Sequence, residues 1–502
     1  MRPHRLPFIA DLQIVLRGLG LIIQVAGWMA LLSLPVPLVF GEHYALPPLL
    51  ITAGLSLALG GGAYLTFRRA GETTLAHGMI ISSLAWLLIP LLGALPLYLT
   101  AVRLLQQPGV PQTIAEFARP VNAIFESFSG YTSTGLTMVL RPEELPRTLQ
   151  WWRSFMQWIG GIGVILFMLA LVSGPGSLSL YYAEARSEKI HPSIRSTVRT
   201  IWWIFLLYTA AAVLLLWLAG MPIWDAINHA MTALATGGFS TRSGSIAYYD
   251  NLWLELALLP VMILGALSFA VHYQLLRNRK LNAFWEDTQS RWFLLIVAGG
   301  IIVLGLENLL RLPVLAGFRE AAFQWTSALC TAGLQSADLH SWSETGKLVL
   351  SLAMVLGAAA GSTGGGIKIV RALILARGVR WRLRRLVARR DVLVRFRLGK
   401  QLLSDEQASA HLIEAGILLI LWWVFLGIGV IVLLHTSPAS YSLGDIVLEV
   451  TSAQGNVGLS TGLTGPGIPL AAKLMLCFNM WLGRLEIIPI LLLFRAILRG
   501  LD

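Results

Sequence analysis

Long apolar runs separated by short polar stretches dominate the hydrophobic pattern of this chain. A helix needs ~20 mostly apolar residues to cross a bilayer, and ten runs approach that length. They lie near residues 18–40, 48–67, 78–101, 151–173, 200–220, 252–275, 292–310, 346–377, 412–434 and 470–496. The pattern therefore predicts an all-α polytopic membrane protein with ten crossings.

The composition supports lipid as the solvent of this fold. Of the 502 residues, 56% are hydrophobic and 13% are charged, against ~25% charged in an ordinary soluble domain. The first apolar run continues past Leu34 without a small-residue cleavage site, which predicts a first membrane helix rather than a removed signal peptide. Cys330 and Cys477 are too few for a disulfide framework or a zinc site, so we assign them no chemical role.

The basic residues predict the orientation of the chain. The formal net charge is +12, but the positive residues lie in short stretches between apolar runs rather than along one solvated face, so we expect no nucleic-acid partner. Outside the eighth span the clusters are Arg2, Arg5 and Arg17; Arg68 and Arg69; Arg277, Arg279 and Lys280; and Arg495 and Arg499. All fall on one side of the predicted membrane, which the positive-inside rule makes the cytoplasmic side. We therefore expect both termini in the cytoplasm.

The densest basic stretch spans residues 368–400, where Asp391 is the only acidic residue. Its basic members are Lys368, Arg371, Arg377, Arg380, Arg382, Arg384, Arg385, Arg389, Arg390, Arg395, Arg397 and Lys400. Such a stretch serves either as an orientation signal that touches anionic headgroups or as a docking surface for a cytoplasmic partner. The sequence leaves both interpretations open.

Four segments on the outer side do not fit simple spans, because they are short and rich in Gly, Ser and Thr. They are residues 119–141, 223–245, 318–340 and 443–465. Irregular backbone at membrane depth is tolerated only where protein buries it or where it lines a watery path. We therefore expect the function of the chain to lie in these segments.

The four segments share one template when they are aligned on a glycine. Their cores are STGLT, TGGFS, TAGLQ and NVGLS, and the shared glycines are Gly135, Gly238, Gly333 and Gly458. Polar residues recur at three fixed distances before the glycine: Ser129, Thr232, Ser327 and Ser452 at six; Glu126, His229, Gln324 and Glu449 at nine; Asn122, Asp225, Glu320 and Asp445 at thirteen. Residues of the last set suit the first turn of a short helix that runs toward the glycine.

Each repeat is thus predicted to contain a membrane helix, a half-length re-entrant helix, an extended glycine-containing strand and a second membrane helix. Four such strands around one axis make rings of carbonyl oxygens that can replace the hydration shell of a monovalent cation. Close helix packing through small residues is the alternative, but it leaves the shared polar positions unexplained. We expect Glu126, His229 and Glu449 to lie apart around the axis and to bond nearby backbone rather than a metal.

Two features interrupt the last spans. Residues 361–366, GSTGGG, make a poor helix interior because each Gly costs ~1 kcal/mol relative to Ala, so we expect either a broken helix that lines the permeation path or a packing kink. Lys368 follows as a pore-facing charge or as the start of the basic stretch. Arg484 lies deep in the tenth span, where a charge indicates function. Glu486 is two residues on and so does not share its helix face.

These motifs, together with QWIGGIG at 157–163, HAMTALATGGFST at 229–241, GSTGGGIK at 361–368 and GNVGLSTG at 455–462, resemble the TrkH/KtrB superfamily of potassium uptake proteins over nearly the whole chain. The two additional N-terminal spans resemble TrkH rather than the shorter KtrB. The resemblance implies four pseudo-symmetric helix–pore-loop–helix repeats after an N-terminal helix pair. The corresponding segments are 1–70 for the pair and 71–175, 176–280, 281–400 and 401–502 for the repeats.

The resemblance also implies roles for individual residues. The transported ion would be K⁺, held by backbone carbonyls of Ser133, Thr134, Gly135, Thr236, Gly237, Gly238, Thr331, Ala332, Gly333, Asn456, Val457 and Gly458. In related plant transporters a serine in place of the first glycine accompanies sodium preference, so Gly135 implies potassium. The gate would comprise Gly361, Ser362, Thr363, Gly364, Gly365 and Gly366, with Arg484 beside it as a positive barrier. A structural ion pair is the alternative role for Arg484.

The resemblance further implies a homodimer in the bacterial inner membrane, in contact with lipid, on a cytoplasmic ring of nucleotide-binding TrkA-type subunits. We expect no organic cofactor and no enzymatic activity in this chain, because the sequence has no nucleophile elbow, HExxH or P-loop. A proton- or sodium-coupled secondary transporter is the alternative function, since such proteins also use repeats and broken helices. Repeats of parallel orientation favour a pore instead.

Overall fold

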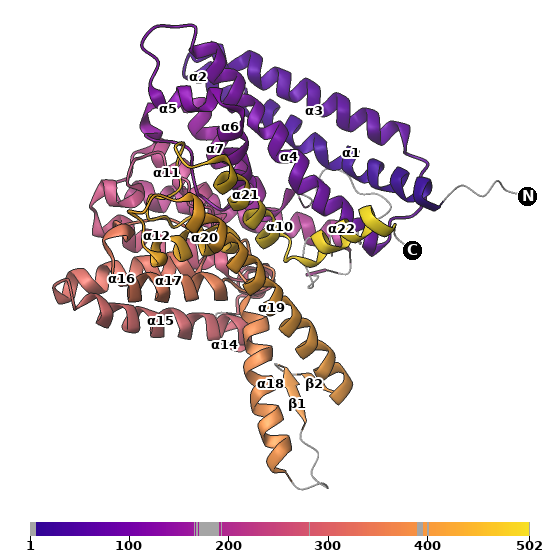
Figure 1. Ribbon diagram of the computed structural model, residues 1–502, viewed down its shortest axis with the longest axis vertical. Helices are drawn as coiled ribbons and strands as arrows, with labels where there is room; N and C mark the ends of the chain where they lie inside the picture. Colours follow the sequence, from indigo (N-terminus) through magenta and orange to yellow (C-terminus); the bar gives the residue numbers. More distant parts are fainter. Residues whose placement is uncertain are drawn as a thin grey trace, which may run out of the picture.

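The computed structural model describes residues 7–164, 166, 169, 190–191, 193–280, 282–388, 395–398 and 401–500. Helices make up nearly all of its regular structure, and they pack into one body from which a helical hairpin protrudes (Figure 1). The predictions for Arg2, Arg5, Arg389, Arg390, Asp391, Lys400 and most of 165–173 lie outside the described residues.

The N-terminal part is a helical layer on one side of the body. It contains α1 (Pro7–Ser33), α2 (Pro35–Val39), η1 (His43–Ala45), α3 (Leu46–Thr66) and α4 (Leu75–Leu104). Helices α1 and α3 lie side by side (Figure 1) and approach closely at two glycines, because a Cβ added at Gly60 would lie 2.7 Å from the carbonyl oxygen of Gly20. Helix α1 starts earlier than the predicted span 18–40, and the short helix α2 follows it.

The remaining chain forms the four repeats. The first repeat continues from α4 with α5 (Gln112–Ala115), η2 (Glu116–Ala118), α6 (Pro120–Tyr131), η3 (Pro142–Glu144) and α7 (Arg147–Ile162). The second contains α10 (Ile194–Leu218), α11 (Ile223–Leu234), η4 (Ser245–Tyr249), α12 (Leu252–Ala266) and α13 (Phe269–Asn278).

The third repeat contains α14 (Ala283–Glu286), α15 (Thr288–Asn308), α16 (Val314–Leu329), η5 (Leu339–Ser341), α17 (Glu344–Leu356) and α18 (Ile369–Val387). The strands β1 (Phe396–Leu398) and β2 (Gln401–Leu403) follow. The fourth contains α19 (Asp405–Thr436), α20 (Leu443–Gly455), α21 (Leu470–Arg484) and α22 (Ile488–Arg499).

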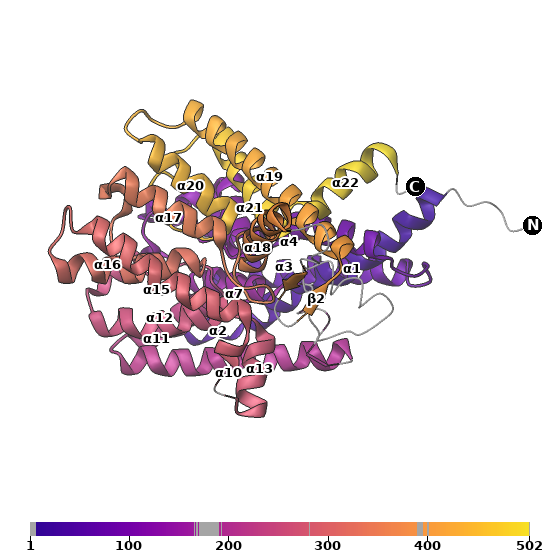
Figure 2. The ribbon, with the colours of Figure 1, turned by 90° about the horizontal axis from the view of Figure 1, so that it is seen from below.

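Four short helices occupy the positions predicted for re-entrant segments. They are α6, α11, α16 and α20, and each packs against the helix that follows the glycine strand of the preceding repeat. The pairs α7 with α11, α12 with α16, α17 with α20 and α21 with α6 close a circle, part of which is visible from below (Figure 2). The repeat organisation of the fold is therefore confirmed.

The helices after the strands differ from the predicted full spans. We call α7, α12, α17 and α21 the post-strand helices; they have 16, 15, 13 and 15 residues. Among the described residues, six helices are long and apolar enough to cross a membrane alone, or seven with the bent pair α12–α13. The predicted spans at 151–173, 252–275 and 470–496 are therefore not continuous helices, whereas the break within 346–377 was predicted.

Three of these breaks were not predicted, and two of them are described on both sides. The span at 252–275 bends by 106° between α12 and α13, where the carbonyls of Gly265 and Ala266 accept hydrogen bonds from the N–H groups of Thr363 and Ala359. The backbone groups released by the bend therefore have partners. The span at 470–496 breaks at residues 485–487, where Glu486 and Ile487 have φ of 58° and 70°.

The protruding hairpin joins the third repeat to the fourth (Figure 1). Helix α18, strands β1 and β2 and the start of α19 enclose a small separate core of Trp381, Phe396 and Ala408. An ion pair of 3.0 Å between Arg385 and Asp405 ties the two helices. Because β1 and β2 pair antiparallel, the described part of the basic stretch belongs to a folded element.

Candidate ion-binding strands and gate

A left-handed residue ends each short helix at the same place in all four repeats. Ser133, Thr236, Thr331 and Asn456 have φ of 53°, 53°, 57° and 53°. The next residue in each repeat donates its backbone N–H to the carbonyl of the residue five positions earlier, over 2.8–2.9 Å. This helix end turns the chain into the segments 133–137, 236–240, 331–335 and 456–460, which we call the glycine strands. The four repeats therefore share backbone geometry as well as sequence.

The shared glycines bring the four glycine strands together in a closed ring. Their φ values are 101° for Gly135, 81° for Gly238, 71° for Gly333 and 100° for Gly458, a region that L side chains rarely adopt. A Cβ added at any of them would clash with a carbonyl oxygen of the next repeat: that of Gly237, Ala332, Val457 or Thr134 in turn. The contacts run from repeat one to two, three, four and back to one. Backbone carbonyls thus surround one axis.

The polar residue nine positions before each glycine fastens its own strand. Glu126 accepts hydrogen bonds from the Thr137 hydroxyl and the Met138 N–H, at 2.9 and 2.7 Å. Glu449 accepts from the Ser460 hydroxyl at 2.8 Å and from the N–H of Thr461 at 3.1 Å. Both carboxylates are fully buried. They hold the strand that leaves the ring, as predicted.

The other two repeats use a histidine and a glutamine for the same purpose. His229 bonds the Ser240 hydroxyl over 3.0 Å and the Asp225 carbonyl over 2.8 Å. Gln324 contacts Ser336 in the third repeat. No group of three metal-ligating side chains occurs within the described residues, and each of these four residues serves its own strand.

The first-turn prediction for the set thirteen positions before the glycine holds for Asn122, Asp225 and Asp445, the third residues of α6, α11 and α20, although their side chains have different partners. Asp445 forms a capping box with Ser442 at the start of α20. Asp225 instead accepts hydrogen bonds from Thr241 and Arg242. Asn122 bonds Glu116 and Lys473, and Glu320 lies beyond the first turn of α16 and pairs with Arg311.

Two buried residues of α7 support the strands and were not predicted. The Arg153 guanidinium pairs with Glu126 at 2.7 Å and donates to the Ser240 carbonyl at 3.0 Å, so it joins the first two repeats. Gln157 donates to the Gly237 carbonyl and accepts from the Phe239 N–H at 3.0 Å. These residues could have been recognised from the sequence, because a polar side chain within a predicted membrane span indicates a specific partner.

A loop of residues 357–368 between α17 and α18, the α17–α18 loop, packs against the ends of the short helices. The Thr363 hydroxyl donates to the carbonyls of Leu234 and Gly265, over 3.0 and 2.8 Å. The N–H groups of Gly365 and Gly366 donate to the Thr331 hydroxyl and the Gly455 carbonyl. The predicted break at 361–366 is therefore present, and it touches three of the four repeats.

Glycine is required at the centre of this loop. A Cβ at Gly364 would lie 2.9 Å from the Thr331 hydroxyl oxygen and 3.1 Å from the Cys330 carbonyl oxygen. A Cβ at Gly365 would clash with the Gly455 carbonyl. Lys368 turns its ammonium group back to the Gly364 carbonyl. The loop consequently lies directly against the backbone that precedes the glycine strands.

Arg484 lies beside this loop, as predicted. Its guanidinium donates to the carbonyls of Gly160, Gly161 and Thr363 and lies 4.9 Å from the centroid of the Trp86 ring. Its partners thus come from α7 and the α17–α18 loop.

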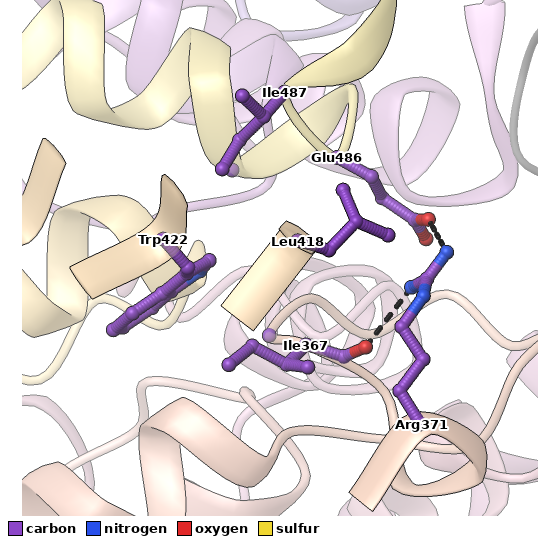
Figure 3. Close-up of a pocket in the computed structure, with 8 residues that line it drawn as sticks. Ile367, Arg371, Leu418, Trp422, Glu486 and Ile487 are labelled. Carbon is purple, nitrogen blue, oxygen red and sulfur yellow. Dashed lines mark hydrogen bonds and ion pairs between the residues drawn. The ribbon is translucent and has the colours of Figure 1, made fainter. Parts of the chain in front are cut away.

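Glu486 pairs with Arg371, near the start of α18. Figure 3 shows this ion pair beside a pocket lined by Ile367, Leu418, Trp422 and Ile487, with a second hydrogen bond from Arg371 to the Ile367 carbonyl. The pair joins the helix that leaves the α17–α18 loop to the break in the last span. The residue pattern gave no indication of this contact.

Comparisons with known proteins agree with this geometry. The family model for TrkH, a cation transport protein, matches residues 49–499. A cation transporter of Methanocaldococcus jannaschii is 30% identical over 97% of this chain and 96% of its own. The Trk system potassium uptake protein TrkH of Halomonas elongata is 31% identical, over 96% and 98%. The crystal structure of the potassium transporter TrkH from Vibrio parahaemolyticus matches with a TM-score of 0.81 and 26% identity, over 96% and 98%.

The fold and the ring of glycine strands define an all-α polytopic membrane protein whose repeats surround a central axis. The match over residues 49–499 is nearly chain-wide. The chain belongs to the TrkH family of cation transport proteins. The family resemblance and the fold class inferred from the sequence are both confirmed.

Proposed function

We propose that this chain takes up K⁺ across the bacterial inner membrane through the ring of glycine strands. The observation that carries the proposal is the closed circuit of contacts from Gly135, Gly238, Gly333 and Gly458 to carbonyls of the next repeat. Such a ring supplies oxygen ligands from four equivalent directions, which suits a dehydrated monovalent cation. The names of the Halomonas and Vibrio relatives, which specify potassium, support the choice of ion.

The ion ligands in this proposal are backbone carbonyls of three residues in each repeat. They are Ser133, Thr134 and Gly135; Thr236, Gly237 and Gly238; Thr331, Ala332 and Gly333; and Asn456, Val457 and Gly458. The left-handed turn before each strand and the buried anchors Glu126, His229, Gln324 and Glu449 support equivalent orientation of these carbonyls. Equivalent ligands matter because selectivity depends on the number and spacing of carbonyl dipoles.

The α17–α18 loop is the proposed gate, with Gly361, Ser362, Thr363, Gly364, Gly365 and Gly366 as its moving part. Its hydrogen bonds to Leu234, Thr331 and Gly455 support a closed position beneath the ring. Arg484, beside the loop, adds a positive charge that opposes cation passage. Opening would require the loop to exchange these hydrogen bonds for others.

The assembly around the pore is part of the same proposal. We expect a homodimer with both termini in the cytoplasm, organised as an N-terminal pair at 1–70 and repeats at 71–175, 176–280, 281–400 and 401–502. A nucleotide-binding TrkA-type ring would dock on the basic stretch 368–400. The protruding hairpin of α18 and α19 supports this role because it carries exposed arginines away from the body (Figure 1).

Uptake of rubidium and sodium into proteoliposomes tests the proposal. The purified chain is reconstituted alone, with an imposed ion gradient and no proton gradient. Potassium-competed rubidium flux is the expected result, and sodium flux should be lower. Flux that appears only with a proton or sodium gradient would instead support the coupled secondary transporter.

A closed gate would also abolish flux, so a second sample separates the two explanations. In the Arg484→Ala variant, a passive pore should pass rubidium without any coupling gradient. If neither the wild type nor this variant conducts unless a gradient of protons or sodium is imposed, the passive pore is wrong. Empty liposomes and liposomes with the Gly465→Ala variant serve as controls, because a Cβ at Gly465 meets nothing within 4 Å.

A further inference from the structure

A second ring of polar contacts surrounds the ring of glycine strands. The fourth residue of every post-strand helix is polar: Gln150 in α7, Glu255 in α12, Lys347 in α17 and Lys473 in α21. These residues are only 2%, 4%, 3% and 7% exposed. Buried polar and charged groups are costly unless they are paired. Because a buried polar residue recurs at the same position of all four helices, we expect the four residues to have the same structural role.

Each of the four side chains binds the short helix of the next repeat. Gln150 accepts a hydrogen bond of 2.7 Å from the Trp224 indole in α11. Glu255 pairs with the Arg319 guanidinium in α16 through contacts of 2.8 and 3.1 Å. These two joints connect repeat one to two and repeat two to three.

The remaining joints complete the circle. Lys347 forms an ion pair with Asp445 of α20, with 2.7 Å between Nζ and Oδ1. Lys473 donates to the Asn122 side-chain oxygen of α6 at 2.7 Å and to the Pro466 carbonyl at 2.8 Å. The last joint connects the fourth repeat to the first. All four partners stand thirteen or fourteen residues before the shared glycine of their repeat.

We propose that Gln150, Glu255, Lys347 and Lys473 are positioning residues that set the width of the glycine-strand ring and thereby the ion selectivity. The inference rests on the proposed function of that ring. Each short helix is held at its far end by one of these joints and at its near end by the glycine–carbonyl contacts. Since a helix transmits displacement along its axis, a loosened joint shifts the strand at the other end.

The joints differ in chemistry, which ranks their expected effects. The second and third joints are ion pairs of opposite charges, the fourth pairs an ammonium with an amide, and the first is a neutral hydrogen bond. Hydrogen bonds with an ionised partner are stronger than neutral ones. Loss of Lys347 should therefore disturb the ring more than loss of Gln150.

The test compares variants of two joints with a matched control on the same helix. Lys347→Met removes the ion pair, whereas Lys347→Arg retains a positive charge in reach of Asp445. Ser351→Ala is the control, because Ser351 is also buried on α17 but its hydroxyl bonds only the Lys347 carbonyl of its own helix. Gln150→Leu breaks the neutral joint and leaves no unpaired buried charge.

The readout is the ratio of rubidium to sodium uptake by folded, purified protein in proteoliposomes. We expect Lys347→Met to lower the ratio at least about threefold and Gln150→Leu to lower it less, since carbonyl spacing controls selectivity. Lys347→Arg and Ser351→Ala should keep the wild-type ratio. A merely structural role would reduce the yield of folded protein without changing the ratio.

Other outcomes overturn specific statements. An unchanged ratio in folded Lys347→Met, or an equal loss in Ser351→Ala, would overturn the positioning role. If Lys347→Met does not fold, Gln150→Leu decides the matter by the same criterion. Absence of potassium-competed uptake in the wild type and in Arg484→Ala would instead overturn the proposed function, and the inference with it.

Discussion

The four repeats have the same geometry at the glycine strands, but they differ at the C-terminal ends of their post-strand helices. At the strands, the left-handed residue before the ring has φ between 53° and 57° in every repeat, and every shared glycine meets a carbonyl of its neighbour. At the C-terminal ends, α7 stops before Gly163 and α12 bends by 106° into α13. Helix α17 is followed by a loop of residues 357–368, and the span that contains α21 breaks at 485–487.

The difference follows from what can occupy an axis. Four copies of a strand can surround an ion, because each contributes carbonyls from its own side. Four copies of a loop cannot all lie on the axis, because they would overlap. The α17–α18 loop bonds the second repeat through Thr363 and the fourth through Gly366. In the proposed function, four equivalent strands select the ion and this single loop closes the path.

The largest effect on ion selectivity is expected from a substitution in the glycine strands, whose geometry the four repeats share. Gly135→Ser should reduce potassium over sodium discrimination by about tenfold or more, because carbonyl spacing sets selectivity. The reason is steric: Gly135 has φ of 101°, and its added Cβ would clash with the Gly237 carbonyl. Competitive uptake of rubidium and sodium into proteoliposomes measures the ratio.

Gly465→Ala is the control for this change, since its Cβ has open space and its ratio should stay at the wild-type value. Unchanged ion preference in folded Gly135→Ser protein would show that the first glycine strand does not belong to the filter.

Substitutions beside the α17–α18 loop should change the rate of ion uptake rather than the ion selectivity. Arg484→Ala should raise rubidium flux about tenfold, since a nearby unit charge opposes cation entry by a few kcal/mol at most. It also removes the hydrogen bonds to Gly160, Gly161 and Thr363 that hold the α17–α18 loop. Initial rates of uptake at matched protein content measure the effect.

Arg499→Ala is the matched control, because Arg499 is an exposed residue of the same C-terminal region. Loss of folded Arg484→Ala protein, without any rise in flux from the remainder, would favour a structural ion-pair or packing role over a barrier.

A smaller increase in flux is expected from the contact between α18 and the last span. Glu486→Gln removes the negative partner of Arg371, which leaves α18 less firmly tied to residues 485–487. We expect flux to rise about two- to fivefold, as such partly exposed pairs contribute up to ~1 kcal/mol. Glu406→Gln, an exposed substitution on α19, should have no effect. A fall in flux would mean that the ion pair supports the open state.

The smallest effect should come from the contact between Glu143 and Ser243, which connects loops of the first two repeats. Burial raises the pKa of Glu143, but hydrogen bonds from backbone N–H groups and the Ser243 hydroxyl, with the charge of Arg242, outweigh it, so the pKa lies below its ordinary value of 4.5. The folded protein therefore gains stability from ionised Glu143 above that value and loses it as the pH falls through the lowered pKa.

Glu143→Gln should change the unfolding midpoint at pH 7 by less than about 2 °C, because exposed pairs contribute little. It should also flatten the fall of that midpoint below pH ~4.5. Thermal unfolding of detergent-solubilised protein at several pH values measures both, with the exposed Glu72→Gln as control. An identical acid slope in Glu143→Gln and wild type would exclude this contribution.

Sequence reasoning located the symmetric part better than the asymmetric part. The template around Gly135, Gly238, Gly333 and Gly458 identified the short helices and the strands, because backbone geometry there depends on local residue type. Gly361–Gly366 likewise indicated one break. The bend at 267–268 and the break at 485–487 escaped detection, because Leu267 and Ile487 are ordinary apolar residues whose backbone is set by the α17–α18 loop and by neighbouring helices.

The sequence by itself determined the membrane class, the fourfold repeat and the family, since these depend on apolar run length and on local motifs. Only the tertiary structure decided which repeats touch. It closed the ring from Gly458 to Thr134, joined Lys347 to Asp445 and Arg371 to Glu486, and placed Arg484 beside Thr363. Contacts between residues far apart in the sequence depend on how helices pack around a common axis, and local residue patterns do not specify that packing.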